Sequence, residues 1–262
     1  MRPQPDLSVV IPAYNEQGRL EPTLRSYAGC FRGRAIAFEL IVVDDGSRDG
    51  TTALVDRVAE ELPELRLIRL AENRGKGYAV RSGVVNARGG LILFADADGA
   101  TPPEELERLR AAIEAGADVA IGSRVLTTGT TTVRARLHRR LIGRAFHLLV
   151  RLCGVQDIAD TQCGFKLFRG EVAHALFSRM RTAGFSFDVE VLMMARLCGY
   201  RIAEVPVNWA HQPGSRINLI TDSVRMAGEL LLIRARRQRG GYAAPHLAPW
   251  TQRPSRTPVA AL

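Results

Sequence analysis

Apolar segments typical of β-strands alternate with segments of helical periodicity over the first two thirds of the chain, and this alternation constrains the fold most. Strands are predicted at residues 7–13, 39–45, 65–70, 91–98 and 117–124. Helices are predicted at residues 50–62, 77–87 and 101–115. Strands joined through helices form parallel sheets with helices on their faces. The sequence therefore predicts an α/β fold with a largely parallel central sheet.

The start of the helix at 101–115 has its own signals. Thr101 is predicted as the N-cap, Pro102 as the first-turn proline and Glu104 as the capping-box glutamate. The helix is therefore expected to begin immediately after the preceding acidic strand end.

The pattern changes beyond residue 125. A Thr/Gly-rich link is expected at 127–132, a basic amphipathic helix at 134–152 and a loop at 157–168. A helix at 187–199, a strand at 201–210 and a final amphipathic helix at 220–239 are expected to follow. We interpret residues 1–239 as one domain that includes these elements. Residues 240–262 are rich in Pro and Ala and are predicted to be a disordered tail.

Composition limits the partners. The chain has 36 Lys and Arg against 27 Asp and Glu, a net charge of +9, which favours an anionic partner. With 6% aromatic residues and no nucleic-acid motif, a nucleic-acid partner is not expected. The four cysteines lack zinc or disulfide spacing, which favours a reducing cytoplasm. No apolar stretch is long enough for a membrane span, and no signal peptide is expected.

Acidic residues end two of the predicted strands. Asp44, Asp45, Asp96 and Asp98 should share one rim, because ligands of open α/β sheets collect at the carboxyl ends of the strands. If the strand continues through Asp98, its side chain and that of Asp96 face the same way, about 7 Å apart. Such a pair binds a divalent cation, or is a polar strand end that caps the next helix. The pair alone leaves both alternatives open.

Other residues on this rim also have two interpretations. For Asp45 and Ser47 a helix cap is favoured, whereas Asp44 is better placed to accept a hydrogen bond from a nucleotide base. Pro12 and Tyr14 could form a rigid wall and Glu16 an acceptor, or the segment could be a simple turn. The segment NRGKG at 73–77 has the glycines and lysine of a phosphate loop but not Walker spacing, and GxGxxG is absent.

Eight motifs, in order, resemble those of inverting family 2 glycosyltransferases. They are IPAYNE, VVDDGS, NRGKGYAVRSG, FADADGAT, IGSR, DTQCGFKLF, FDVEVL and EVPVNW followed by GSR, and they cover roughly residues 7–235. Within that family, the set most resembles dolichyl-phosphate β-glucosyltransferases and less closely dolichol-phosphate mannose synthases. The resemblance implies a GT-A-type fold and transfer of a sugar from a nucleotide diphosphate to a polyprenyl phosphate.

The resemblance also implies roles for individual residues. Donor-binding positions are Pro12, Tyr14, Glu16, Asp44, Lys76 and Asp96. Asp96 and Asp98 match the DxD motif that holds Mg²⁺ or Mn²⁺. Of the two, Asp98 is the one expected to bind the metal directly. The mannose synthases have a further glutamine ligand where this chain has Ala100, and glucosyl-type members share the alanine. This favours UDP-glucose, with GDP-mannose or a UDP-N-acetylhexosamine as the alternative donors.

The acceptor phosphate requires cations but no general base. A polyprenyl monophosphate is largely dianionic at pH 7, since its second pKa is about 6. The cations we expect around it are Arg124, Arg139, Lys166 and Arg216, each of which could instead be a solvated surface charge. Gln162, Asp188 and Glu190 are expected to position the acceptor or sugar, with a structural helix cap as the alternative for the two acids.

A long lipid acceptor implies docking on the cytoplasmic face of an anionic membrane, through the basic helices at 134–152 and 220–239. In the second helix, the four residues Leu230 to Ile233 could insert into lipid, or the helix could belong to the core with a solvated charged end. The remaining alternatives are a transferase with a non-lipid acceptor and a nucleic-acid-binding protein.

Overall fold

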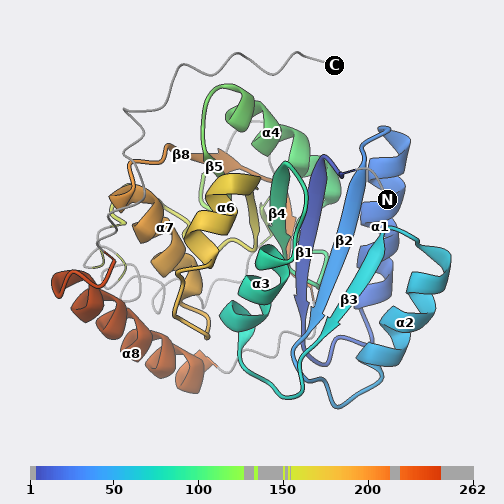
Figure 1. Cartoon of the computed structure of the whole chain (residues 1–262), viewed down its shortest axis with the longest axis horizontal. Helices are drawn as coiled ribbons and strands as arrows, with labels where there is room; N and C mark the ends of the chain where they lie inside the picture. Colours follow the sequence, from blue (N-terminus) through green and yellow to red (C-terminus); the bar gives the residue numbers. More distant parts are fainter. Residues whose placement is uncertain are drawn as a thin grey trace.

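The computed structural model describes residues 4–126, 133–134, 150, 153, 155–212 and 219–242 (Figure 1). Its strands are β1 (Leu7–Ala13), β2 (Phe38–Asp44), β3 (Leu65–Arg69), β4 (Leu91–Ala95), β5 (Val119–Ser123), β6 (Val133–Arg134), β7 (Phe165–Arg169), β8 (Ile202–Pro206) and β9 (Trp209–Ala210). Its helices are α1 (Leu20–Gly33), α2 (Thr51–Glu61), α3 (Lys76–Val85), the 3₁₀ turn η1 (Pro103–Glu105), α4 (Leu106–Glu114), α6 (Gly170–Phe177), α7 (Phe187–Leu197) and α8 (Leu219–Gln238).

Within these residues, a seven-stranded sheet has the order β3-β2-β1-β4-β7-β5-β8. β1 pairs in parallel with β2 and β4, β2 with β3, and β5 with β8. β7 is antiparallel to both of its neighbours, β4 and β5. The expectation of an α/β fold with a largely parallel sheet is confirmed. The carboxyl ends of β1, β2 and β4 consequently meet at one edge.

Helices cover both faces of the sheet. Along β1, Val10 packs with the layer of α3, α6 and α7, whereas Val9 and Ile11 pack with α1, α2 and α4. This alternation is the period of two that a strand imposes on its side chains. In the view of Figure 1, α3, α6 and α7 lie in front of the sheet, and α8 lies below them. Both faces are apolar, which explains the nearly continuous hydrophobic strands.

α1, β7 and α6 lie where no helix or strand was predicted from the sequence. α1 buries Leu20, Leu24 and Phe31 at helical spacing, and β7 occupies the end of the segment that we expected to be a loop. α6 follows β7 directly. The position of β7 depends on its two distant neighbours in the sheet, which local sequence does not reveal.

Two local predictions at the acidic motif are wrong. β4 ends at Ala95 and the chain turns at Gly99, where φ is +65°, so Asp96 and Asp98 are not on one face of a strand. The predicted capping box does not form either. Pro102 is extended, the helical segment begins at Pro103, and no side chain caps it. A residue before proline is disfavoured in the helical region, which explains the late start.

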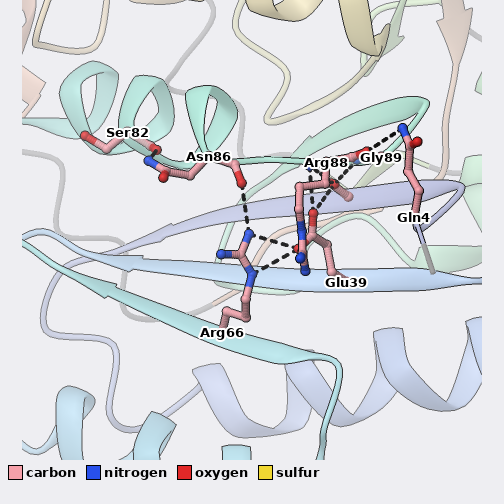
Figure 2. A network of polar contacts seen from close by, with 8 residues as sticks. Gln4, Glu39, Arg66, Ser82, Asn86, Arg88 and Gly89 are labelled. Carbon is pink, nitrogen blue, oxygen red and sulfur yellow. Dashed lines mark hydrogen bonds and ion pairs between the residues drawn. The ribbon is translucent and has the colours of Figure 1, made fainter. Parts of the chain in front are cut away.

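A charged network closes the opposite, amino end of the sheet (Figure 2). The buried Glu39 carboxylate accepts hydrogen bonds from the Ser8 hydroxyl at 2.6 Å and from Arg66 Nε at 3.0 Å. The Arg88 backbone N–H donates to it at 2.8 Å. Ser8 in turn accepts the Gly89 N–H at 2.8 Å. This network joins β1, β2 and β3 to the segment before β4.

α8 is attached to the core along one face. Leu230 and Ile233 are buried, whereas Leu231 and Leu232 are each 57% exposed. Tyr242, in the segment expected to begin the disordered tail, donates a hydrogen bond to Glu190 at 2.7 Å. Residues 243–262 and most of the expected helix at 134–152 lie outside the described residues. None of the helices that the structure describes is long and apolar enough to cross a bilayer.

Candidate functional site

The loops that follow β1 and β2 are joined by hydrogen bonds. The Asn15 N–H donates to Ser47 Oγ at 2.9 Å, and the Arg48 N–H donates to Asn15 Oδ1 at 2.7 Å. The Glu16 N–H donates to Thr51 Oγ1 at 2.8 Å. Asn15 has a φ of +55°, a conformation that asparagine tolerates better than most residues. The segment is therefore more than a simple turn, because it fixes the two loops relative to each other.

The predicted donor residues on these loops differ in exposure. Pro12 is buried in β1, and Tyr14 is half-buried just beyond it. The carboxylate of Glu16 accepts a hydrogen bond from Arg19 Nη2 at 2.7 Å. Asp44 ends β2 and is 3% exposed, and its carboxylate accepts the Ser47 N–H at 2.9 Å and the Thr52 hydroxyl.

Asp45 and Ser47 are not helix caps, contrary to the favoured interpretation. α2 begins at Thr51 after Gly50, with no side-chain cap. The Asp45 carboxylate accepts the backbone N–H groups of Arg74 and Gly75, at 2.8 and 2.9 Å. These N–H groups of the NRGKG segment are thus already bonded within the protein. A long-range partner replaced the local one that the sequence suggested.

Asp96 and Lys76 form an ion pair at the carboxyl end of the sheet. Lys76 Nζ lies 2.7 Å from Asp96 Oδ1, and the two side chains are 25% and 36% exposed. The same ammonium lies 5.3 Å from the centre of the Phe94 ring. Burial lowers the pKa of Lys76, but the carboxylates of Asp96 and Asp188 outweigh that effect and raise it above its ordinary value. The lysine is therefore a permanent cation at this position.

Asp98 lies beside this pair. Its carboxylate accepts the Ala100 N–H at 3.0 Å. Burial and the charge of Asp96 raise the pKa of Asp98. The pKa of Arg19 is raised mainly by its hydrogen bond to Glu16, and the nearby charges of Asp98 and Asp96 raise it further. The two aspartates thus lie in each other's field, a setting that favours a bound cation.

A second ion pair lies near the same aromatic ring. Lys166 on β7 is 1% exposed, and its Nζ lies 2.6 Å from Asp188 Oδ1 on α7. That ammonium also donates to the Cys163 carbonyl at 2.5 Å and lies 5.6 Å from the Phe94 ring centre. Asp188 is 4% exposed. The charge of Lys166 is compensated inside the protein.

Arg124 is also bonded within the protein. Its Nε and Nη2 donate to the two oxygens of Asp160 at 2.7 and 2.8 Å, and its backbone N–H donates to Asp160 at 2.9 Å. The Asp160 N–H donates to Glu204 on β8 at 2.8 Å. This bidentate pair fixes the loop before β7, in which Gln162 is half-buried. Cys163 is fully buried, and burial raises the pKa of its thiol to about 12, as expected of a packed cysteine.

Glu190 has structural partners in addition to Tyr242. Its Oε2 accepts the N–H groups of Arg181 and Thr182, at 3.1 and 2.7 Å. These bonds favour a structural role, although they hold a neighbouring segment rather than cap a helix. Arg139 and Arg216 lie outside the described residues.

The structure thus brings Lys76, Asp96, Asp98, Lys166 and Asp188 together, with both ammonium groups near the Phe94 ring. Sequence reasoning missed Arg19 and Asp160 as members of the charged site. Arg19 follows Glu16 by three residues, a spacing at which opposite charges meet in helical turns, and this signal could have revealed it. Asp160 has no such local signal, because Arg124 is 36 residues away.

Two half-buried carboxylates and nearby cations suit a metal-bound anionic ligand. Carboxylate oxygens are the ligands that Mg²⁺ and Mn²⁺ prefer, so Asp96 and Asp98 fit such an ion. Among the residues that the structure describes, no group of three or more His, Cys, Asp or Glu side chains is arranged around one metal position.

Comparisons with known proteins show the family of the chain. The model of the glycosyl transferase family 2 matches residues 8–177. The chain is 39% identical over 246 residues to the dolichyl-phosphate beta-glucosyltransferase of Saccharomyces cerevisiae, covering 87% of this chain and 74% of that protein. It is 37% identical over 254 residues to the human protein of the same name, covering 92% and 78%.

Solved structures show the same fold at lower identity. Glucosyl-3-phosphoglycerate synthase from Mycobacterium tuberculosis, in complex with Mn²⁺, UDP-glucose and phosphoglyceric acid, matches with a TM-score of 0.66. The two chains are 20% identical, and the match covers 88% of this chain and 80% of the other. At this identity the likeness shows the fold alone.

Proposed function

We propose, from the premise that this chain belongs to glycosyl transferase family 2, that it transfers glucose from UDP-glucose to a dolichyl-type polyprenyl phosphate with inversion. The chain is a glycosyltransferase with a GT-A-type fold, as the motifs predicted. The observation that carries the proposal is the 36–39% identity, over most of the chain, to several proteins named as dolichyl-phosphate beta-glucosyltransferases.

The donor binds at the carboxyl ends of β1, β2 and β4. Asp44 and Tyr14 would contact the nucleotide, and Asp96 and Asp98 would hold the Mg²⁺ or Mn²⁺ ion. When bound, the ion neutralises the nucleoside diphosphate that leaves. The observation that supports this placement is the closeness of the two carboxylates. Burial, together with the negative charge of Asp96, raises the pKa of Asp98.

The acceptor phosphate attacks the anomeric carbon while the nucleoside diphosphate leaves from the opposite side. The bond to the acceptor oxygen forms as the bond to the diphosphate oxygen breaks, which inverts the configuration. The phosphate is already ionised, so none of the acids near the site has to remove a proton. Arg139 and Arg216 screen the incoming charge, and Gln162 helps to position the acceptor. Arg124 and Lys166, whose charges have partners, hold the loop before β7 and α7 in place.

The lipid acceptor places the protein at the surface of an anionic membrane, on its cytoplasmic face. Val224, Leu231 and Leu232 on α8 are exposed apolar side chains, and arginines follow them along the helix. Apolar insertion together with attraction to anionic headgroups is the usual basis of peripheral binding.

The test is a transfer assay with a panel of donors and acceptors. UDP-glucose with dolichyl phosphate and Mn²⁺ should give a lipid-linked glucose of β configuration. GDP-mannose and UDP-N-acetylglucosamine, or omission of the lipid, should give little product. Efficient glucose transfer to a soluble acceptor without the lipid would contradict the acceptor assignment.

The Asp98→Asn variant tests the metal assignment. The amide preserves the shape of the side chain but removes the charge that a hard cation requires. Turnover should fall at least about 100-fold, because the stabilisation of the leaving diphosphate is lost. Circular dichroism should show an unchanged fold. Full Mg²⁺-dependent turnover in the folded variant would refute the role of Asp98.

A further inference from the structure

The position of Lys76 is fixed by close backbone packing. It is the first residue of α3, between Gly75 and Gly77. A Cβ at Gly75 would lie 2.5 Å from the Ala183 carbonyl oxygen, and one at Gly77 would lie 2.5 Å from that of Thr182. Gly75 also has a φ of +98°. The start of α3 is therefore held against the segment before α7, and Lys76 projects from a defined backbone.

Local helix chemistry does not explain a lysine at this position. The amino end of a helix carries a partial positive charge, which favours acidic rather than basic side chains there. The first turn of α3 contains no acidic residue, and Lys76 opens it. The partner that compensates this cation is Asp96, on a different element.

Lys76 is paired with a carboxylate oxygen of Asp96 that would otherwise be available to bind a metal ion. Its ammonium lies 2.7 Å from Asp96 Oδ1. A Mg²⁺ ion bound to that oxygen would stand at about 2.0–2.1 Å from it, within repulsive range of the ammonium. The rest of the carboxylate is confined as well, since a Cβ at Gly164 would lie 1.9 Å from Asp96 Oδ2. Lysine and metal therefore cannot both be placed at Asp96 without mutual repulsion.

We propose that Lys76 is an internal cation that competes with the divalent metal for Asp96, and that the donor diphosphate relieves this competition by accepting the lysine. The diphosphate supplies an anionic partner for the ammonium, so metal and nucleotide bind with positive coupling. Lys76 is thus a positioning residue that makes metal binding depend on the donor. The identity of that donor rests on the proposed function, whereas the competition itself does not.

The test measures Mn²⁺ binding by calorimetry, with and without UDP. Without nucleotide, Lys76→Gln should bind Mn²⁺ at least about fivefold more tightly than the native protein, the low end of typical coupling between sites. With saturating Mn²⁺, the same variant should bind UDP at least about fivefold more weakly. Lys76→Arg keeps the charge and should bind Mn²⁺ alone like the native protein.

Two controls separate a local effect from a general one. Arg81→Gln removes the same charge from α3, where the guanidinium donates to the Ser178 carbonyl at 3.2 Å, and should change neither affinity. In an Asp96→Asn background, Lys76→Gln should no longer improve Mn²⁺ binding. Equal or weaker Mn²⁺ binding by folded Lys76→Gln without nucleotide would overturn the proposal. Because this titration uses no sugar donor, a failure of the glucosyl assignment would leave its outcome intact.

Discussion

The position of the Asp96 carboxylate depends on a residue that has no side chain. The carboxylate lies against Gly164, where any Cβ would come within 1.9 Å of Oδ2. The Asp96 N–H also donates to the Gly164 carbonyl at 3.0 Å. The end of β4 and the segment before β7 are therefore in contact at Gly164. This contact sets the orientation of the Asp96 carboxylate.

Substituting Gly164 with alanine should displace the Asp96 carboxylate while leaving the core intact. Turnover should fall about 100-fold, a loss that a shift of about 1 Å in a reacting group can cause. Steady-state rates with UDP-glucose, and Mn²⁺ titration of the same sample, measure the effect.

Gly29→Ala is the matched control for this substitution. Beyond the local backbone of α1 itself, no atom lies within 4 Å of a Cβ at Gly29. That variant should retain activity and gain about 0.5–1 kcal/mol of stability, because alanine restricts the unfolded chain. Native turnover by Gly164→Ala would show that the carboxylate can move without consequence.

At the scale of elements, the turn of α8 divides four adjacent apolar residues between two environments. The helical period places Leu230 and Ile233 in the core, and Leu231 and Leu232 on the outside. The core alternative is thus correct for Leu230 and Ile233, whereas insertion of the exposed Leu231 and Leu232 into lipid stays a prediction. Insertion of all four into lipid is excluded, because two of them fill the space between α8 and the rest of the core.

Replacing Leu231 and Leu232 together with serine should weaken binding to anionic liposomes. Each buried leucine contributes about 1.5–3 kcal/mol, so co-sedimentation should fall at least about tenfold. Thermal stability should change little, since both side chains are exposed. Leu230→Ala should instead lower the stability by about 2–5 kcal/mol, because it leaves a cavity. Undiminished co-sedimentation of the double variant would exclude this face of α8 as the docking surface.

On the scale of the whole molecule, the two ends of the sheet differ in how deeply their charged side chains are buried. The carboxyl end contains the half-buried charges of Lys76, Asp96 and Asp98, whereas the amino end contains the buried Glu39 network (Figure 2). Burial raises the pKa of Glu39, but Ser8, the Arg88 N–H and Arg66 outweigh it and hold the pKa below its ordinary value. This carboxylate therefore stabilises the fold without taking part in catalysis.

Glu39→Gln should destabilise the protein in a pH-dependent way. Because the folded pKa lies below the unfolded value of about 4.5, the native advantage is complete above that pH and is lost as the pH falls through the folded pKa. At pH 7 the variant should lose about 1–3 kcal/mol, the cost of leaving buried groups without their partner. Urea unfolding at several pH values measures this, and turnover at pH 7 should remain native.

Glu64→Gln is the control at the surface. Its partner Arg32 has a side chain 46% exposed, so the variant should lose less than about 1 kcal/mol. A loss for Glu39→Gln that is the same at pH 7 and below pH 4 would contradict the ionised state of Glu39.

Local pattern sufficed for much of the site. Asp44 and Asp96 lie at one edge because parallel strands end together, and Asp188 begins a helix as its sequence suggested. The roles of Asp45 and Lys166 could not be predicted in the same way. Asp45 is bonded to Arg74, 29 residues away, and Lys166 is paired with Asp188, 22 residues away, and only packing brings these residues into contact.

The sequence by itself determined the alternation of strands and helices, the two apolar faces of the sheet and the acids at its carboxyl edge. These properties follow from side-chain periodicity within short segments. The tertiary structure alone decided where β7 enters the sheet, because strand pairing joins segments that are distant in the chain. By inserting β7 between β4 and β5, the fold buries Lys166 against Asp188 and brings Gly164 against Asp96. The same long-range packing sets Lys76 on Asp96, since the distance between them depends on contacts of α3 that no local pattern specifies.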